Sequence, residues 1–142
     1  MPSPELLQTP VLSAVELTAR WSDLLEPPVF AARSLWLAWV RADGLMLPVV
    51  TPIDDVPLRP EPDLMPGLRA LHKAVAASEP EPLHLATALC RPGRPLVSAD
   101  DAAWAATLRE EVGDRIDGTW SLHLAAGGSV LPLVNPPRWA WS

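Results

Sequence analysis

Apolar residues recur every three to four positions in three segments of the chain, and this spacing predicts helices. The three segments are residues 13–25, 63–78 and 98–113. Ser13 opens the first segment with Glu16 three positions later, which is the spacing of a capping box. Asp63 and Ser98 stand at the starts of the other two segments and are expected to cap them. Each predicted helix therefore has its own start signal.

Shorter apolar runs between these segments predict five strands. They cover residues 34–41, 45–51, 82–90, 119–125 and 130–134. Asp43-Gly44 separates the first two runs and Gly127-Gly128 separates the last two, so each pair is expected to form an antiparallel hairpin. Pro48 has no amide hydrogen and indicates an edge position or a bulge in the second strand. The middle run is apolar almost throughout, as in a strand that is buried on both faces.

The order of these elements is helix, hairpin, helix, strand, helix, hairpin. This order predicts an α/β (α+β) fold, in which about three helices pack on one mixed five-stranded sheet. Residues 13–134 are expected to form a single domain, after an extended arm at 1–12 and before a Pro- and Trp-rich tail at 135–142. The helix at 63–78 lies between the second and third strands, so it is expected to form a right-handed parallel crossover.

Composition narrows the classes of protein to which the chain can belong. Eighteen of its 142 residues are Pro, which rules out a long coiled coil because each interior Pro costs a helix about 3 kcal/mol. The net charge of −6 and the isoelectric point of about 4.9 argue against nucleic acid as a partner. The chain has no run of about 18 apolar residues and no basic, apolar leader, so we expect a cytoplasmic protein with no membrane partner.

Three stretches of the chain carry a resemblance to a known family. They read LWLAWVRADGLMLPVV, HLATALCRPGRPLVSADD and SLHLAAGGSVLPLV. With the order of elements, they resemble the JAB/MPN fold over residues 33–134, and its RadC-like branch most closely. The resemblance implies that the buried strand runs into a metal-site loop of the form His-x-His-Pro, followed by a helix that opens with Pro-Ser-x-x-Asp. The whole run also resembles uncharacterised proteins of GC-rich bacteria.

Most ligands of the family's metal motif are missing from this chain. Three residues match the motif: Pro92, Ser98 and Asp101. Asp101 corresponds to a metal ligand, but the two ligand histidines fall on Leu89 and Arg91, and the catalytic Glu has no counterpart near residues 32–33. Arg91 cannot lose its proton and would place a permanent charge where the metal belongs. The resemblance therefore implies a degenerate, metal-free relative with no catalytic residue and no cofactor.

The polar residues of the loop 89–101 allow two interpretations. Arg91 and Arg94 form the only short basic cluster and can hold one small anion, with Ser98 and the start of the next helix supplying further donors. Asp101 is either a partner for Arg91 in a charge-assisted pair or an ordinary acid in the first helical turn. Ser98 is expected to be a helix cap rather than a nucleophile.

Other titratable residues offer further alternatives. His84 and His123 each lie in a predicted strand and can share a face, so with Asp101 they form a displaced metal site or are simply half-exposed. Cys90 is either a reactive thiolate or, as we expect, a small buried residue. His72 lies on the helix at 63–78 and is expected to be solvated.

Two features of the sequence bear on surfaces. The six acids and two Arg between residues 100 and 117 give that region a charge of −4, which indicates a solvated helix face or a docking surface for a basic partner. Trp139 and Trp141 lie in the tail and are expected to pack back onto the sheet or onto a second copy of the chain.

Two functions remain open at this point. The first is a non-catalytic, metal-free interaction or scaffold protein of JAB/MPN type, whose partner is another protein or a second copy of itself. The alternative is a small enzyme or anion-binding domain that uses Arg91, Arg94, Ser98 and Asp101.

Overall fold

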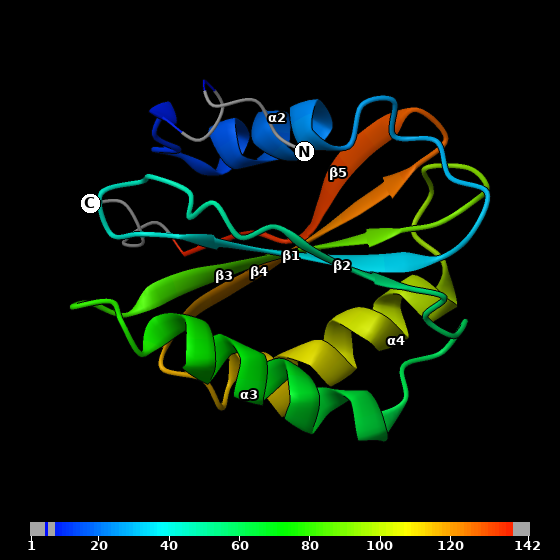
Figure 1. Ribbon diagram of the computed structural model, residues 1–142. Helices are drawn as coiled ribbons and strands as arrows, with labels where there is room; N and C mark the ends of the chain where they lie inside the picture. The colour runs from blue at the N-terminus through cyan, green and yellow to red at the C-terminus, as the bar shows by residue number, and fades with distance from the viewer. Residues whose placement is uncertain (1–4, 6–7, 138–142) are drawn as a thin grey trace.

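The computed structural model of the chain describes residue 5 and residues 8–137, and a five-stranded sheet forms its centre (Figure 1). The strands are β1 (Ser34–Val40), β2 (Thr51–Asp54), β3 (Leu83–Cys90), β4 (Gly118–Ala126) and β5 (Ser129–Val134). The helices are α2 (Ala14–Leu24), α3 (Met65–Ala76) and α4 (Ala99–Leu108). Within these described residues, no helix is long and apolar enough to cross a membrane.

The sheet is mixed, with the strand order β2-β1-β3-β4-β5. β3 runs parallel to β4, whereas the other three neighbouring pairs are antiparallel. Helix α4 connects the parallel pair, and α3 leads from β2 past β1 to β3. The predicted fold class, with one mixed five-stranded sheet and three helices in the predicted order, is confirmed.

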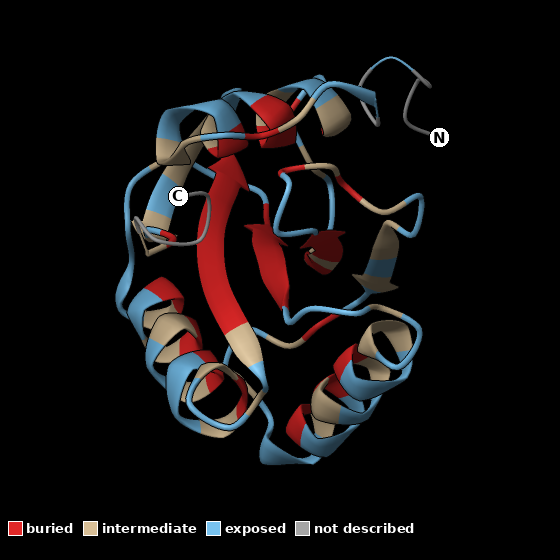
Figure 2. Cartoon of the chain, turned by 90° about the vertical axis from the view of Figure 1, so that its left-hand side faces the viewer, coloured by how far each residue is buried: buried red, intermediate tan, exposed pale blue. Residues whose placement is uncertain are grey.

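Helices cover both faces of the sheet (Figures 1 and 2). Side chains of different size fill the two faces. Because side chains alternate across a strand, large residues gather on the face under α3 and α4. That face includes Leu37, Trp39, Leu85, Leu89 and Trp120. The face under α2 consists mainly of small residues, which are Ala38, Ala86, Ala88, Cys90 and Ala125. Leu17 and Trp21 of α2 pack on this flatter face and supply the bulk that it lacks.

The second strand departs from its prediction at residues 45–51. Met46 forms an isolated antiparallel bridge with Val40, and regular pairing resumes only where Thr51 lies opposite Leu37. Between these two pairs the first strand advances by three residues and the second by five, so two extra residues bulge out around Pro48. The bulge that Pro48 indicated is present, and it moves the regular strand to 51–54.

The start of α3 also differs from the prediction. Asp63 does not cap the helix, because it lies inside a 3-10 turn, Pro62–Leu64, that leads directly into α3. Pro66 occupies the first turn of α3, where its missing amide hydrogen has no intrahelical acceptor to lose. Ser13 and Ser98 cap α2 and α4 as predicted, since each hydroxyl accepts a hydrogen bond from the backbone three residues later.

Each edge strand of the sheet carries a proline. β2 contains Pro52, opposite Trp36 of β1, and β5 contains Pro132, opposite His123 of β4. A proline cannot donate to a further strand, so this residue type is tolerated at the edges of a sheet. Two of the many prolines are therefore explained by the topology.

Candidate functional site

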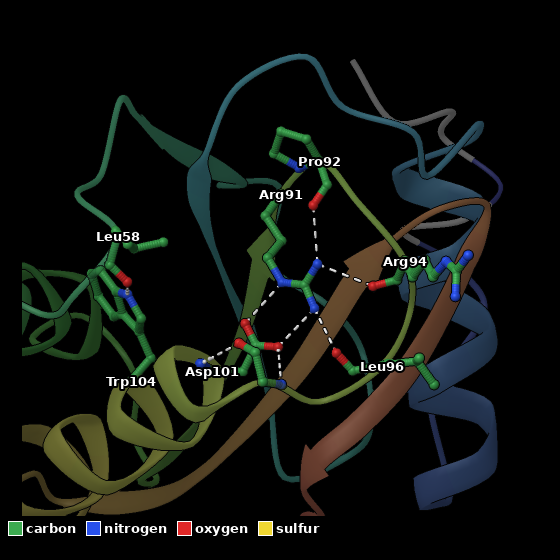
Figure 3. Close-up of polar contacts among 8 residues, drawn as sticks. Leu58, Arg91, Pro92, Arg94, Leu96, Asp101 and Trp104 are labelled. Carbon is green, nitrogen blue, oxygen red and sulfur yellow. Dashed lines mark hydrogen bonds and ion pairs between the residues drawn. The ribbon is translucent and has the colours of Figure 1, made fainter.

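The loop between β3 and α4, together with the first turn of α4, holds all four residues that the sequence singled out. It begins at Arg91, directly after the buried strand β3, and ends at Ser98, which caps α4. The backbone of Arg91 stays in register with the sheet, since its N–H donates to the Ala125 carbonyl of β4 at 3.1 Å. The guanidinium of Arg91 turns back toward the loop and the start of α4 (Figure 3).

The guanidinium of Arg91 uses all five of its N–H donors inside the molecule (Figure 3). Nε donates to Asp101 Oδ1 at 2.8 Å, and Nη2 donates to Asp101 Oδ2 at 2.7 Å. The remaining three donors reach backbone carbonyls of the loop: those of Pro92 and Arg94 at 3.0 Å and that of Leu96 at 2.8 Å. The side chain therefore has no N–H left to offer to a ligand.

The carboxylate of Asp101 is held just as completely. Its Oδ2 also accepts from the backbone N–H of Ser98 at 2.9 Å, while the Asp101 N–H donates to Ser98 Oγ at 3.1 Å. This reciprocal pair is a capping box at the start of α4. Asp101 is therefore both the helix cap partner and the counterion of Arg91, and it ties the loop to the helix.

The ion pair between Arg91 and Asp101 is buried, and both of its groups stay charged. Arg91 is 6% exposed and Asp101 is 0% exposed. The hydrogen bonds that Arg91 donates to Asp101 raise the pKa of Arg91, although burial by itself lowers that pKa. Burial alone raises the pKa of Asp101, but the bonds from Arg91 and Ser98 outweigh it and leave that pKa below its ordinary value. Both groups are thus charged at neutral pH and neutralise each other.

The loop is also fixed from the side of the β4–β5 turn. A Cβ on Gly127 would lie only 2.8 Å from Pro95 Cδ and 2.9 Å from the Gly93 carbonyl oxygen. Only a residue without a side chain admits so close an approach of the two segments. The two large hydrophobic side chains of the loop nevertheless remain exposed, Leu96 at 65% and Val97 at 55%.

The structure brings together three of the four predicted site residues. Arg91, Ser98 and Asp101 form one hydrogen-bonded unit, so the predicted Ser98 cap is confirmed, and of the two alternatives for Asp101 the structure shows the pair with Arg91. Arg94 contributes only its backbone carbonyl to this unit, and its side chain is exposed. Leu89, on which the resemblance places a ligand histidine, is buried in the core under α3 and α4.

His84 and His123 lie on the same face of the sheet, as predicted, but they are not half-exposed. His84 is 4% exposed, and its two ring nitrogens lie 2.7 Å from Thr119 Oγ1 and 2.8 Å from Ser121 Oγ. Thr119 of β4 lies opposite His84 of β3. His123 lies four residues further along β4, a distance of about 13 Å. This separation is too long for one metal ion. Among the described residues, no three His, Cys, Asp or Glu side chains are placed to hold one.

Cys90 is the small buried residue that we expected. It is 0% exposed, and burial raises the pKa of its thiol to about 12, although a hydrogen bond with Ser34 acts in the opposite direction. A thiol that stays protonated at neutral pH is a poor nucleophile. The alternative of a reactive thiolate is therefore wrong.

His72 was predicted to be solvated, and this prediction is wrong. Its side chain is 2% exposed, accepts from Trp39 Nε1 at 3.1 Å and lies 2.9 Å from the Asp117 carbonyl through its other nitrogen. The imidazole thus links β1, α3 and the segment before β4. Sequence reasoning missed it because its neighbour Lys73 suggested an exposed face, while its true helical neighbours are Leu68 and Met65.

The acidic segment 100–117 presents less charge than its sequence suggests. Asp101 is buried, Asp100 lies 3.5 Å from Arg59, and Glu111 lies 3.7 Å from Arg69. These contacts favour the interpretation as a solvated helix face over a docking surface for a basic partner.

Trp139 and Trp141, for which we predicted packing on the sheet or on a second copy, lie outside the described residues. Comparisons with protein-family models, with curated proteins and with solved structures found no match to the chain.

Proposed function

We propose that the chain is a non-catalytic, metal-free interaction domain of JAB/MPN type, which acts in the cytoplasm and contacts another protein through the loop 91–98. The partner is a different protein or a second copy of the chain. The observation that carries this proposal is the Arg91–Asp101 pair, in which every guanidinium donor and both carboxylate oxygens are already bound.

The pair occupies the place at which the resemblance expects a metal. A ligand-binding Asp101 would have to give up two bonds to Arg91 and leave a buried guanidinium without its counterion. The order of elements and the matching Pro92, Ser98 and Asp101 support the JAB/MPN assignment. The ion pair then takes over the structural role of the metal, because it bridges the end of β3 to the start of α4.

The same geometry disfavours the alternative of an anion-binding site. Arg91 has no free donor, which leaves the exposed side chain of Arg94 as the only basic group of the predicted pair that a ligand could reach. One exposed Arg makes a weak, strongly screened contact with an anion.

A loop that is ordered before binding loses less conformational entropy when a partner docks. Three donors of the Arg91 side chain hold the loop 91–98, and the turn at Gly127 packs against it. Leu96 and Val97 are the apolar residues that it exposes, so they are the contact residues in this proposal.

Metal and anion binding test the non-catalytic half of the proposal. We expect the purified chain, incubated with excess zinc and then dialysed, to retain no stoichiometric metal by elemental analysis. We also expect inorganic phosphate to leave its melting temperature unchanged, since the donors of Arg91 are occupied. One zinc per chain that is lost in Asp101→Asn, or a phosphate-induced shift that is lost in Arg91→Ala, would contradict the proposal.

Partner capture tests the interaction half. We expect cross-linking in lysate of the native host to recover one protein, or a second copy of the chain, with the wild type but not with Leu96→Asp/Val97→Asp. Arg59→Glu, which alters an exposed Arg outside the loop, is the matched control and should capture as the wild type does. Equal capture by the loop variant, with its fold verified by circular dichroism, would remove the loop as the docking element.

A further inference from the structure

His123 lies between the sheet and α2, with no room for a second proton. Its side chain is 0% exposed, and Nε2 lies 2.8 Å from Thr18 Oγ1 of α2. The Thr18 hydroxyl donates its one proton to the Ala14 carbonyl at 3.2 Å. His123 must therefore be the donor in its contact with Thr18, through a protonated Nε2. Its Nδ1 is a buried lone pair without a hydrogen-bond partner.

No charged group in the described structure offsets a positive charge on His123. Across the sheet it faces Ala88 of β3 and Pro132 of β5, and β5 has no titratable residue. The titratable residues of β3 are His84 and Cys90, which also lie on this face and are neutral at pH 7.

The charged residues of α2 do not compensate His123 either. Arg20 turns away and donates to the Thr9 carbonyl, while Glu16 and Asp23 are exposed. Burial accordingly lowers the pKa of His123 to about 4, with no charged partner acting on it.

The layer formed by α2 is the weaker of the two helical layers. It is a single helix of 11 residues on a face of small side chains, whereas α3 and α4 together cover the large leucines and tryptophans of the other face. One helix buries less apolar area than two helices do, so less free energy opposes its separation. Local opening of such a layer can precede global unfolding.

We propose that α2 is an acid-released layer: protonation of His123 lifts it from the sheet while the sheet, α3 and α4 remain folded. The open form exposes the face of Ala38, Ala86, Ala88 and Ala125. The side chains that tie the loop 91–98 to α4, Arg91 and Asp101, lie outside α2.

The sign of the effect follows from the two protonation equilibria. In the open form His123 is solvated and titrates near its ordinary pKa of about 6.5, so it takes up a proton below that pH. In the closed form it stays neutral down to pH of about 4. The opening equilibrium is therefore constant above about pH 6.5 and rises up to tenfold per pH unit between about 6.5 and 4.

Cys90, the only cysteine of the chain, reports this opening. It lies in the same cluster as Leu17 and Trp21 of α2 and is fully buried. A disulfide reagent modifies Cys90 only when α2 is open. We divide this rate by the rate for the denatured chain at the same pH, which removes the effect of thiol ionisation on the reaction. The resulting ratio measures the open fraction. We expect this ratio to rise about 30-fold from pH 7.5 to pH 5.0 through His123 alone. Amide exchange of α2 should rise in parallel and that of α4 should not.

Two variants separate His123 from His72, the histidine of the opposite face. His123→Gln keeps a donor for Thr18 but cannot take up a proton, so the His123-dependent, about 30-fold rise should disappear. His72→Gln alters a buried histidine on the opposite face and should leave the rise intact. The proposal fails if His123→Gln shows the wild-type rise, or if α2 and α4 lose amide protection together in the wild type. The comparison of amide exchange in α2 and α4 uses the wild type alone, so it tests the proposal even if a variant does not fold.

Discussion

Replacing Asp101 by Asn is expected to lower the free energy of unfolding by about 3–5 kcal/mol, because it leaves the buried guanidinium of Arg91 without a counterion. Asn has nearly the same shape and can still accept one hydrogen bond, so the loss reports the charge rather than a cavity. Arg91→Met should lower the free energy of unfolding by a similar amount, because it leaves the buried carboxylate without a counterion and the three loop carbonyls without their donors. Urea unfolding at pH 7 with linear extrapolation measures these changes.

A matched exposed pair provides the control. Asp100 lies in the first turn of α4, as Asp101 does, and its Oδ1 is 3.5 Å from Nε of Arg59, whose side chain is 83% exposed. Arg59→Met should therefore change stability by less than about 1 kcal/mol. The double variant Arg91→Met/Asp101→Asn should be more stable than the sum of its single changes implies, because it leaves no isolated charge. Strictly additive losses would show that the two side chains act independently.

Gly118→Ala is expected to be the most damaging single-methyl change in the chain. Gly118 opens β4 at φ +115°, a conformation that L side chains rarely adopt. A Cβ there would lie 2.1 Å from the carbonyl oxygen of Leu83, which is its partner on the neighbouring strand. Since backbone cannot rotate away as a side chain can, the β3–β4 pair must shift. We expect a loss of more than about 3 kcal/mol, or no folded protein, in thermal and urea unfolding.

Gly128→Ala separates backbone strain from this collision. Gly128 has φ +87°, but a Cβ there meets nothing within 4 Å. Gly128→Ala should therefore lower the free energy of unfolding only by the strain of a side chain in this backbone conformation, about 1–2 kcal/mol. If Gly118→Ala were no worse than Gly128→Ala, the close approach of β4 to β3 at Leu83 would not hold in solution.

The architecture follows closely from the sequence because its local signals agree. The caps at Ser13 and Ser98, the apolar run at 82–90 and the glycines at 127–128 each belong to one element and require no tertiary information. The second strand was placed six residues too early at its start, at 45 rather than 51, although Pro48 had marked the bulge. A pattern of apolar residues shows that a chain is extended, but not which residues pair with the neighbouring strand.

The candidate site was predictable in part. The choice between an ion pair and an ordinary acid at Asp101 stayed open in the sequence, and the geometry decides it in favour of the pair. The three loop carbonyls around Arg91 could not be predicted, because backbone acceptors have no residue-type signature. His72 was missed for a related reason: its partners are an indole of β1 and a carbonyl 45 residues away.

The prolines of the two edge strands restrict how copies of this chain can associate. A growing β-ribbon or amyloid-like stack requires an unbroken row of donors along an outer strand. Pro52 interrupts that row in β2 and Pro132 interrupts it in β5. Even at the high concentrations of overexpression, we expect any self-association to involve loops or helices rather than an extension of the sheet. The chain should accordingly bind no thioflavin T when it is concentrated at neutral pH.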